Sequence, residues 1–362
     1  MTSQKTPEST SAKIQNLKLV DLHRHLEGSL RPETLWDFHC RENQSFHGGL
    51  ESLRQACTIA PGAVPGFKSF LSRFDALRFI YGGLDALERL AAEAVADAAD
   101  DGVIHLELRF SPVFFARRLR VSKSSPGIHV PPPFEVVEQA ADAIVQSARR
   151  EATRRGISLA FIITLGRHFG AEVNRPSAEL LSRPIGTQLS ALDLAGDESY
   201  PACDFVEFFR MWKAAGRGVT IHAGEDIAGP GAKNVYEALE LGADRIGHGV
   251  LAANDPVLIQ KLIENQITLE LCLTSNVQTG ACSGFSTHPL KRLLDAGVRV
   301  TINTDDPCIS VTTLRAEYTR AEANCGLTHD DLLRCTLNAA NAAYLPKHQK
   351  VALIQRIENS WD

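Results

Sequence analysis

Two histidines, His23 and His25, are separated by one residue at the end of a β-favouring stretch that begins at Leu19. Residues two apart on a strand project from the same face, so both imidazoles would point the same way. If buried side by side, they would leave ring nitrogens unpaired unless something binds their lone pairs, and a divalent metal is the obvious candidate. The alternative is a surface strand that carries two solvated histidines.

Three further polar clusters follow apolar, strand-like stretches. They are His222 with Glu225 three residues later, His248 between two glycines, and the adjacent pair Asp305 and Asp306. Adjacent carboxylates repel each other unless one is neutralised, and a metal bound to Asp305 would do this and leave Asp306 as a hydrogen-bond acceptor. Taken singly, an Asp pair usually marks a turn and a Gly-flanked His is usually structural. Together, three His and one Asp, with His248 beside them, fit a mononuclear zinc site with room for a water.

The segments that must position these residues alternate regularly between strand-like and helix-like patterns. Helices are expected after Ser29, as N-cap, with Pro32 in the first turn, and over 84–100 and 134–156. Beyond the His-x-His stretch, strands are expected at 103–110, 157–164, 189–194, 219–222, 245–248, 268–273 and 298–303. Eight strands alternating with helices predict a (β/α)8 barrel of the TIM type, with the site built at the C-terminal strand ends.

One segment between the first two strands is expected to be inserted over the mouth of this barrel. Residues 40–66, with two Pro-Gly pairs, are expected to be irregular, and helical spacing of apolar residues follows from Phe67. Phe70, Leu71 and Phe74 are either ordinary core residues of this helix or the wall of a ligand pocket. The segment 116–133 is expected to be a longer loop that carries no chemistry.

Composition limits the class of protein. The 362 residues include 43 acidic and 38 basic ones, a net charge of −5, without long blocks of one sign. No nucleic-acid footprint is therefore expected, and small-molecule or protein partners are favoured, with the oligomeric state open. Residues 1–15 are expected to form a flexible polar tail and residues 16–362 a single domain.

The eight cysteines are scattered without a Cys-x-x-Cys pair, which is typical of reduced thiols in the cytoplasm. No apolar run approaches the roughly 18 residues that a membrane span needs, and the N-terminus lacks the pattern of a signal peptide. No membrane partner is expected.

In combination and order, the motifs resemble the adenosine deaminase family of metal-dependent amidohydrolases, from about Leu19 to about Pro346. The segments that carry the similarity are His23 to Gly28, Phe70 to Asp75, Glu107 to Pro112, Leu192 to Glu198, His222 to Glu225, Gly247 to Gly249, Thr274 to Asn276 and Thr304 to Pro307.

This resemblance implies roles for individual residues. It implies one Zn²⁺ per chain, a purine nucleoside as substrate, and Glu225 as the group that protonates a purine ring nitrogen. His248 would orient and deprotonate the water, Asp306 would share a proton with the imidazole nitrogen of the purine, and Gly196 would offer its backbone N–H to the pyrimidine side. The implied zinc ligands are His23, His25, His222 and Asp305, and His25 would also border the substrate.

One departure concerns Glu27. Family members that act on adenosine commonly carry Asp there, where the carboxylate holds the ribose 5′-hydroxyl, and one extra methylene changes what fits. Relatives that act on adenine or on the 5′-extended nucleoside 6-amino-6-deoxyfutalosine can carry Glu. Adenine-type relatives tend to have Asp in place of Gly247, so a nucleoside is favoured. Arg24 points away from the metal by strand alternation, so it is not expected to bind an extension, which favours adenosine.

The sequence disfavours three rival interpretations. A two-metal amidohydrolase would normally use a bridging lysine on the fourth strand, and residues 190–194 contain none. A zinc site of the cytidine deaminase type needs a Pro-Cys-x-x-Cys motif, which is missing from the sequence. A non-catalytic barrel that only binds a partner is disfavoured by the complete set of metal ligands.

Overall fold

The computed structural model describes residues 14, 16–41, 48–79, 82–119 and 130–361. The expected polar tail at residues 1–15 therefore falls, apart from Ile14, outside the described residues. Ile14 itself is buried and packs in the main hydrophobic core.

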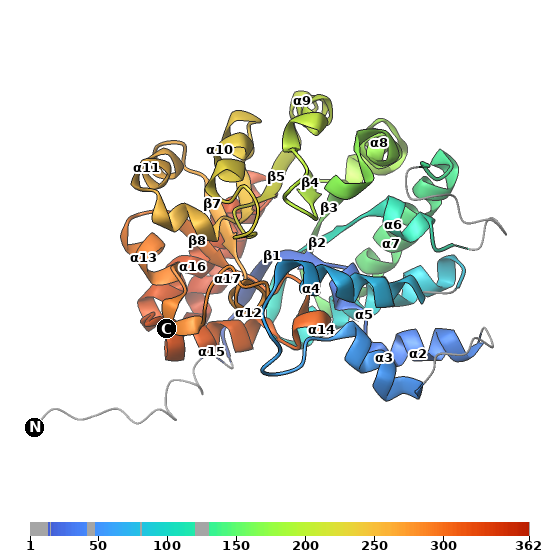
Figure 1. The fold of residues 1–362 in the computed structure, drawn as a ribbon, viewed down its shortest axis with the longest axis horizontal. Coiled ribbons are helices and arrows are strands. Elements are labelled where there is room, and N and C mark those ends of the chain that lie inside the picture. The colour runs from blue at the N-terminus through green and yellow to red at the C-terminus, as the bar shows by residue number, and fades with distance from the viewer. Residues whose placement is uncertain (1–13, 15, 42–47, 80–81, 120–129, 362) are drawn as a thin grey trace, which may run out of the picture.

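Eight parallel strands pair in chain order at the centre of the molecule (Figure 1), which confirms the predicted barrel. The inner segment of the third strand, Ala160 to Ile163, is a continuous apolar run, which is typical of a parallel strand buried on both faces. The strands are β1 (Leu19–His25), β2 (Val103–Phe110), β3 (Ser158–Gly166), β4 (Ala191–Ala195), β5 (Gly218–Ala223), β6 (Arg245–His248), β7 (Thr268–Leu271) and β8 (Arg299–Ile302).

The helices surround the strands (Figure 1). In the long helix after the insertion, Leu87, Leu90, Ala91 and Ala94 recur at helical spacing and are buried, so one face packs inward. The helices are α2 (Pro32–Arg41), α3 (Gly49–Cys57), α4 (Phe67–Leu71), α5 (Leu84–Asp100), α6 (Pro112–Ala116), α7 (Phe134–Arg155), α8 (Ala171–Glu179), α9 (Val206–Ala214), α10 (Ala232–Glu240), α11 (Pro256–Glu264), α12 (Leu273–Gln278), α13 (Leu290–Asp295), α14 (Pro307–Ser310), α15 (Leu314–Cys325), α16 (His329–Ala342) and α17 (Lys347–Trp361).

The barrel closes between β8 and β1 through the residues that follow β8. The N–H of Asp305 donates to the carbonyl of His23 at 2.7 Å, and the N–H of His25 donates to the carbonyl of Asp305 at 2.9 Å. The hydroxyl of Thr304 also donates to Asp21 at 2.6 Å. Two backbone hydrogen bonds of this seam therefore involve the His-x-His pair and Asp305 directly.

Three local predictions differ from the structure. Ser29 is not the N-cap of α2, because it ends a 3₁₀ turn, Glu27–Ser29, and its hydroxyl donates to the carbonyl of His25 at 2.7 Å. Residues 40–66 are not irregular throughout, because α3 lies among them and buries Leu53 and Cys57, one turn apart. The apolar stretch from Phe67 starts as α4 and continues as a 3₁₀ helix, Ser72–Phe79, in place of one regular α-helix.

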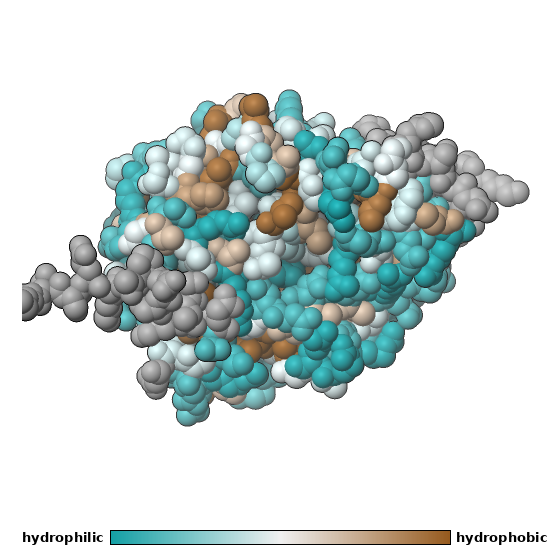
Figure 2. Space-filling view, turned by 90° about the horizontal axis from the view of Figure 1, so that it is seen from below, coloured by the Kyte–Doolittle hydropathy of each residue, from teal (hydrophilic) through white to brown (hydrophobic). Residues whose placement is uncertain are grey.

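Figure 2 shows one face of the molecule, where hydrophilic residues predominate and hydrophobic ones form small separate groups. In the described part of the chain, every helix is too short or too polar to cross a lipid bilayer.

Candidate metal centre and active site

Ring nitrogens from two strands converge beside a carboxylate at the C-terminal ends of the barrel strands. The Nε2 atoms of His25 and His222 lie 3.1 Å apart. Oδ1 of Asp305 lies 3.3 Å from Nε2 of His23 and 3.5 Å from Nε2 of His25. All four residues are buried, and Nε2 of His23 has no hydrogen-bond partner. Three ring nitrogens and a carboxylate oxygen, all able to bind a metal ion, therefore lie close together, and hydrogen bonds among them cannot satisfy all of their lone pairs.

Two buried carboxylates set the direction of these lone pairs. Nδ1 of His23 lies 2.7 Å from Glu270 on β7, and Nδ1 of His222 lies 2.9 Å from Asp193 on β4. A carboxylate only accepts when ionised, so each Nδ1 carries the proton and each Nε2 presents a lone pair to the cluster. This is the arrangement that orients histidines toward a metal ion.

Arg109 on β2 keeps both carboxylates ionised. Its guanidinium donates to Glu270 at 2.7 Å and lies 3.4 Å from Asp193, all three side chains being fully buried. Burial alone would raise the pKa of Asp193, but His222 and Arg109 together lower it well below its usual range. For Glu270, Arg109 and Arg245 likewise outweigh burial and lower the pKa.

Glu225 follows β5 and lies beside the histidine cluster. Its Oε2 atom is 3.3 Å from Nε2 of His248. Its backbone N–H and that of Gly224 each donate to the carboxylate of Glu198 at 2.8 Å, which fixes the turn that carries the side chain. Burial, followed by the negative charges of Asp305 and Glu198, raises the pKa of Glu225 well above its usual value and favours the neutral acid.

Asp306 is the second buried acid at this end of the barrel. Its Oδ1 atom has no hydrogen-bond partner, and burial together with the charges of Asp305 and Glu27 raises its pKa well above the usual value. A Cβ atom on Gly28 would lie 1.7 Å from this Oδ1, so the absence of a side chain at Gly28 leaves the space that Asp306 occupies. A protonated Asp306 can donate a hydrogen bond into the cavity beside it.

Backbone strain coincides with the cluster. His248 and Asp305 both have φ of +62°, in the left-handed region that residues with a side chain seldom adopt. Such conformations persist at functional sites when the surrounding structure enforces them. Here the seam bonds of Asp305 and the β5–β6 pairing of His248 provide that restraint.

A cavity of about 570 Å³ opens from this cluster. Glu27 lies in its wall, with Oε1 accepting the N–H of Ser111 at 2.7 Å and Oε2 buried without a partner. Burial raises the pKa of Glu27 to about 7. The cavity is also bordered by the other predicted substrate-side residues, His25, Phe70, Leu71, Phe74, Gly196, His222, Glu225, His248, Asp305 and Asp306.

Gly196 follows β4 in this wall and has a φ of +99°, which favours glycine. A Cβ atom there would lie 2.9 Å from Nδ1 of His168, so a side chain would meet steric as well as conformational resistance. The backbone at this position is thus the group that can reach a bound molecule.

The sequence profile of the adenosine deaminase family matches residues 18–360. Adenosine deaminase from Klebsiella pneumoniae strain 342 is 38% identical over 346 residues, which cover 94% of this chain and 98% of that protein. Adenosine deaminase from Photorhabdus laumondii is 38% identical over 347 residues, covering 95% and 98%. The chain belongs to the adenosine deaminase family.

Several solved structures have the same fold as this protein. An adenine deaminase from Arthrobacter aurescens superposes with a TM-score of 0.81 at 22% identity, covering 95% of this chain and 98% of that one. An amidohydrolase from Burkholderia ambifaria with bound zinc superposes with a TM-score of 0.84 at 22% identity, covering 100% and 95%.

Several residues of this site were not predicted from the sequence. They include Asp193 and Glu270, each an acidic residue between two leucines within a short strand. The segment 116–133, which was expected to carry no chemistry, does contribute to the site, because Arg117 and Arg118 line the cavity. Residues 120–129 of that segment lie outside the described residues.

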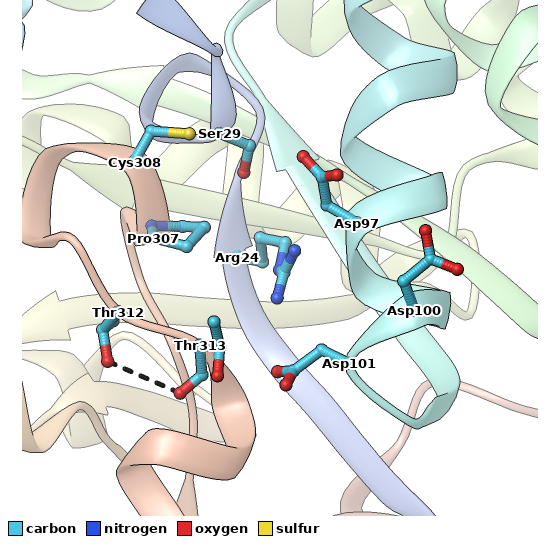
Figure 3. Close-up of a pocket in the computed structure, with 9 residues that line it drawn as sticks. All are labelled: Arg24, Ser29, Asp97, Asp100, Asp101, Pro307, Cys308, Thr312 and Thr313. Atoms are coloured by element: carbon cyan, nitrogen blue, oxygen red, sulfur yellow. Dashed lines mark hydrogen bonds between the residues drawn. The ribbon is translucent and has the colours of Figure 1, made fainter. Parts of the chain in front are cut away.

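Arg24 faces away from the histidine cluster, as strand alternation predicts. Its Nε donates to Asp21 at 3.0 Å, and its side chain borders a second cavity of about 340 Å³. Figure 3 shows Arg24 between the acidic residues at the end of α5 and Thr312 and Thr313. The cavity beside His25 therefore lacks the Arg24 guanidinium.

We expect a Phe74→Ala variant to raise KM for an adenine nucleoside about 10-fold, about 1.4 kcal/mol of binding, with a smaller change in kcat. Phe74 is half-buried and lines the cavity, so removing its ring removes contact with a bound molecule in ground and transition states alike. Steady-state kinetics and a melting curve check this. Phe134→Ala, a half-buried phenyl group outside the cavity, is the matched control for lost packing. A lower melting temperature with an unchanged KM at Phe74 would assign it to the core alone.

Proposed function

We propose that this protein catalyses the zinc-dependent hydrolytic deamination of adenosine and 2′-deoxyadenosine at C6, giving inosine or 2′-deoxyinosine and ammonia in purine metabolism. The observation that carries the proposal is the buried carboxyl group of Glu225, which lies beside His248 and next to the cluster of His23, His222 and Asp305. This arrangement supports the proposal, because hydrolysis of a C–N bond needs both a proton donor and an activated water molecule at the same end of one cavity.

The proposed cofactor is one Zn²⁺ per chain, held by His23, His25, His222 and Asp305. Ligands about 2.0–2.2 Å from a tetrahedral zinc ion lie about 3.3–3.6 Å from one another. Three separations among these atoms, 3.1, 3.3 and 3.5 Å, are close to that range. The four-residue group whose ligand atoms all lie within 4.8 Å of one another contains His248 in place of His25. When bound, the ion would lower the pKa of a water molecule and so make it a nucleophile near neutral pH.

The residues around the cavity would supply the proton transfers and the hydrogen bonds to the purine. As the water oxygen bonds to C6, Glu225 gives its proton to N1 of the purine, which removes the charge that develops there. Asp306 donates to N7, and the N–H of Gly196 donates to the pyrimidine side of the ring. The C6–N6 bond then breaks and ammonia leaves. One hydrogen of the water restores Glu225 and the other leaves on the ammonia.

The free oxygen of Glu27 supports a nucleoside with a 5′-hydroxyl as the substrate. Ser111 occupies one carboxyl oxygen, so Oε2 is available to accept from the sugar. The alternatives remain 6-amino-6-deoxyfutalosine and adenine. Some structural relatives are described as complexes with IMP, such as a plant enzyme with a TM-score of 0.78 at 22% identity, so purine binding recurs in this fold.

We expect 5′-deoxyadenosine to be a poorer substrate than adenosine by roughly 10- to 150-fold in kcat/KM. The missing hydroxyl leaves the buried Glu27 carboxyl without its partner, a loss of about 1.5–3 kcal/mol. The assay follows absorbance for adenosine, 5′-deoxyadenosine, adenine and 6-amino-6-deoxyfutalosine side by side. The matched comparison is 2′-deoxyadenosine, which lacks a hydroxyl at a different carbon.

Equal rates for adenosine and 5′-deoxyadenosine, both far below the extended nucleoside, would transfer the proposal to 6-amino-6-deoxyfutalosine. In that event Glu27→Asp should gain nothing on adenosine.

All eight cysteines are free thiols, and the cytoplasm stays the predicted compartment.

A further inference from the structure

A series of buried hydrogen bonds leads from His288 through Asn276 to His248, and its meaning for catalysis rests on the proposed function. His248 ends β6, and its two ring nitrogens face different partners. Nε2 lies 3.3 Å from Oε2 of Glu225, on the cavity side. Nδ1 lies 3.0 Å from the side-chain nitrogen of Asn276 on α12. Whether His248 presents a proton or a lone pair to the cavity therefore depends on Asn276.

The orientation of the Asn276 amide is set by a backbone group that can only donate. The N–H of Cys272 points to Oδ1 of Asn276 at 3.3 Å. If the amide were flipped, its NH₂ group would face this N–H, and two buried donors would oppose each other. Asn276 is fully buried, so no water compensates for such an arrangement. Its NH₂ group therefore faces His248.

His288 supports the same orientation from the other side. The backbone N–H of Leu290 donates to Nδ1 of His288 at 3.2 Å, so that nitrogen is an acceptor. Burial lowers the pKa of His288 to about 4, which leaves one ring proton, on Nε2. Nε2 lies 3.2 Å from Oδ1 of Asn276, where this proton is donated. Two backbone N–H groups, at Cys272 and Leu290, thus fix the direction of every bond in the chain.

The donor and acceptor roles in this series of hydrogen bonds determine which nitrogen of His248 carries the proton. Since the Asn276 NH₂ group donates to Nδ1 of His248, this nitrogen holds a lone pair, and the ring proton of His248 sits on Nε2. We infer that Asn276 and His288 are positioning residues that hold His248 in the Nε2–H tautomer, so that His248 acts as a hydrogen-bond donor in the cavity. The opposite tautomer would set Nδ1–H against the Asn276 NH₂ group at 3.0 Å.

This assignment changes the role expected for His248. A nitrogen that carries the proton cannot also accept one from the attacking water, so His248 is not the base. It can instead donate to the oxygen that bonds to C6, and to the Glu225 carboxylate once Glu225 has protonated N1. It also has no lone pair on the cavity side for a metal, although it lies within 4.8 Å of possible ligand atoms of His23, His222 and Asp305.

The test reads the tautomer directly by long-range ¹H–¹⁵N NMR of protein labelled at its twelve histidines. The His248 signals are assigned as those that vanish in a His248→Gln variant, and spectra are taken without metal and with zinc. We expect a protonated Nε2 and an unprotonated Nδ1 for His248 in both. An unprotonated Nε2 in the metal-free protein would overturn the inference.

An Asn276→Asp variant should reverse the tautomer, because a carboxylate accepts from Nδ1–H while still accepting from Cys272 and His288. We expect kcat to fall by about 10²-fold with KM little changed, as for loss of one preorganised donor. Asn265→Asp, the same exchange at an exposed position, should alter neither. An unchanged His248 tautomer in Asn276→Asp would refute the role given to Asn276.

If Asn276→Asp does not fold, the wild-type spectrum and two His288 variants decide. His288→Gln retains a donor toward Asn276 and should preserve the Nε2–H signal better than His288→Leu; no difference between them would exclude His288 from the chain. Failure of this inference is separable from failure of the proposed function. Turnover of adenosine with the wrong tautomer rejects only the inference, whereas the expected tautomer without turnover rejects only the function.

Discussion

A Glu225→Gln variant is expected to retain zinc and nucleoside binding and to lose about 10²- to 10⁴-fold in kcat, the usual contribution of a positioned proton donor. The amide has the same shape and can hydrogen-bond to N1, but it cannot deliver a proton as charge develops on the ring. Because the proton is needed in the transition state, kcat and kcat/KM should fall together.

The measurement is steady-state kinetics with metal analysis of the same preparation. Asp226→Asn is the matched control, since it removes the neighbouring buried carboxylate, which caps the N–H of Ala228 and does not line the cavity. Near-normal turnover by Glu225→Gln would reject Glu225 as the acid. Loss of zinc from this variant would instead assign Glu225 to metal binding.

Replacing His23 by Ala is expected to reduce bound zinc from one per chain to almost none and to abolish activity with it. His23 is fully buried, and Glu270 directs its Nε2 lone pair at the cluster, so the substitution removes one of the four proposed ligands. Elemental analysis after purification without chelators, together with an adenosine assay, checks both effects.

Two further variants serve as comparisons for His23→Ala. Glu270→Gln leaves His23 present but weakens its orientation, so metal affinity should fall by a smaller factor, about 10- to 100-fold. His348→Ala removes an exposed imidazole on α17 and should change neither zinc content nor activity. Two ions per chain in the wild-type protein, or one ion retained by His23→Ala, would contradict the proposed ligand set.

The barrel and the residues at its strand ends were predictable because both depend on local patterns. The strands follow short stretches rich in apolar and β-branched residues, and His23, His222, His248 and Asp305 lie at or near the ends of such stretches. Parallel strands in a barrel bring these ends to the same face, so order along the chain was enough to place them together.

Other parts of the site depend on contacts between distant segments. Asp193 and Glu270 lie inside strands, and only the barrel shows that each reaches a histidine on another strand. His288 follows Asn276 by twelve residues, a spacing that no regular element explains. Helix α3 was missed because Gly48 and Gly49 at its start are typical of a turn and no side chain caps it.

The seam between β8 and β1 has a consequence for how the protein is made. Asp305 joins His23 and His25 through its backbone, across about 280 residues of chain. A nascent chain that has reached β7 already contains His23, His25 and His222, yet the strand that brings Asp305 to them has not been synthesised. The proposed metal site would therefore be completed only after translation has passed Asp305 and the barrel has closed, so binding of the ion in the final geometry would belong to the last stage of maturation.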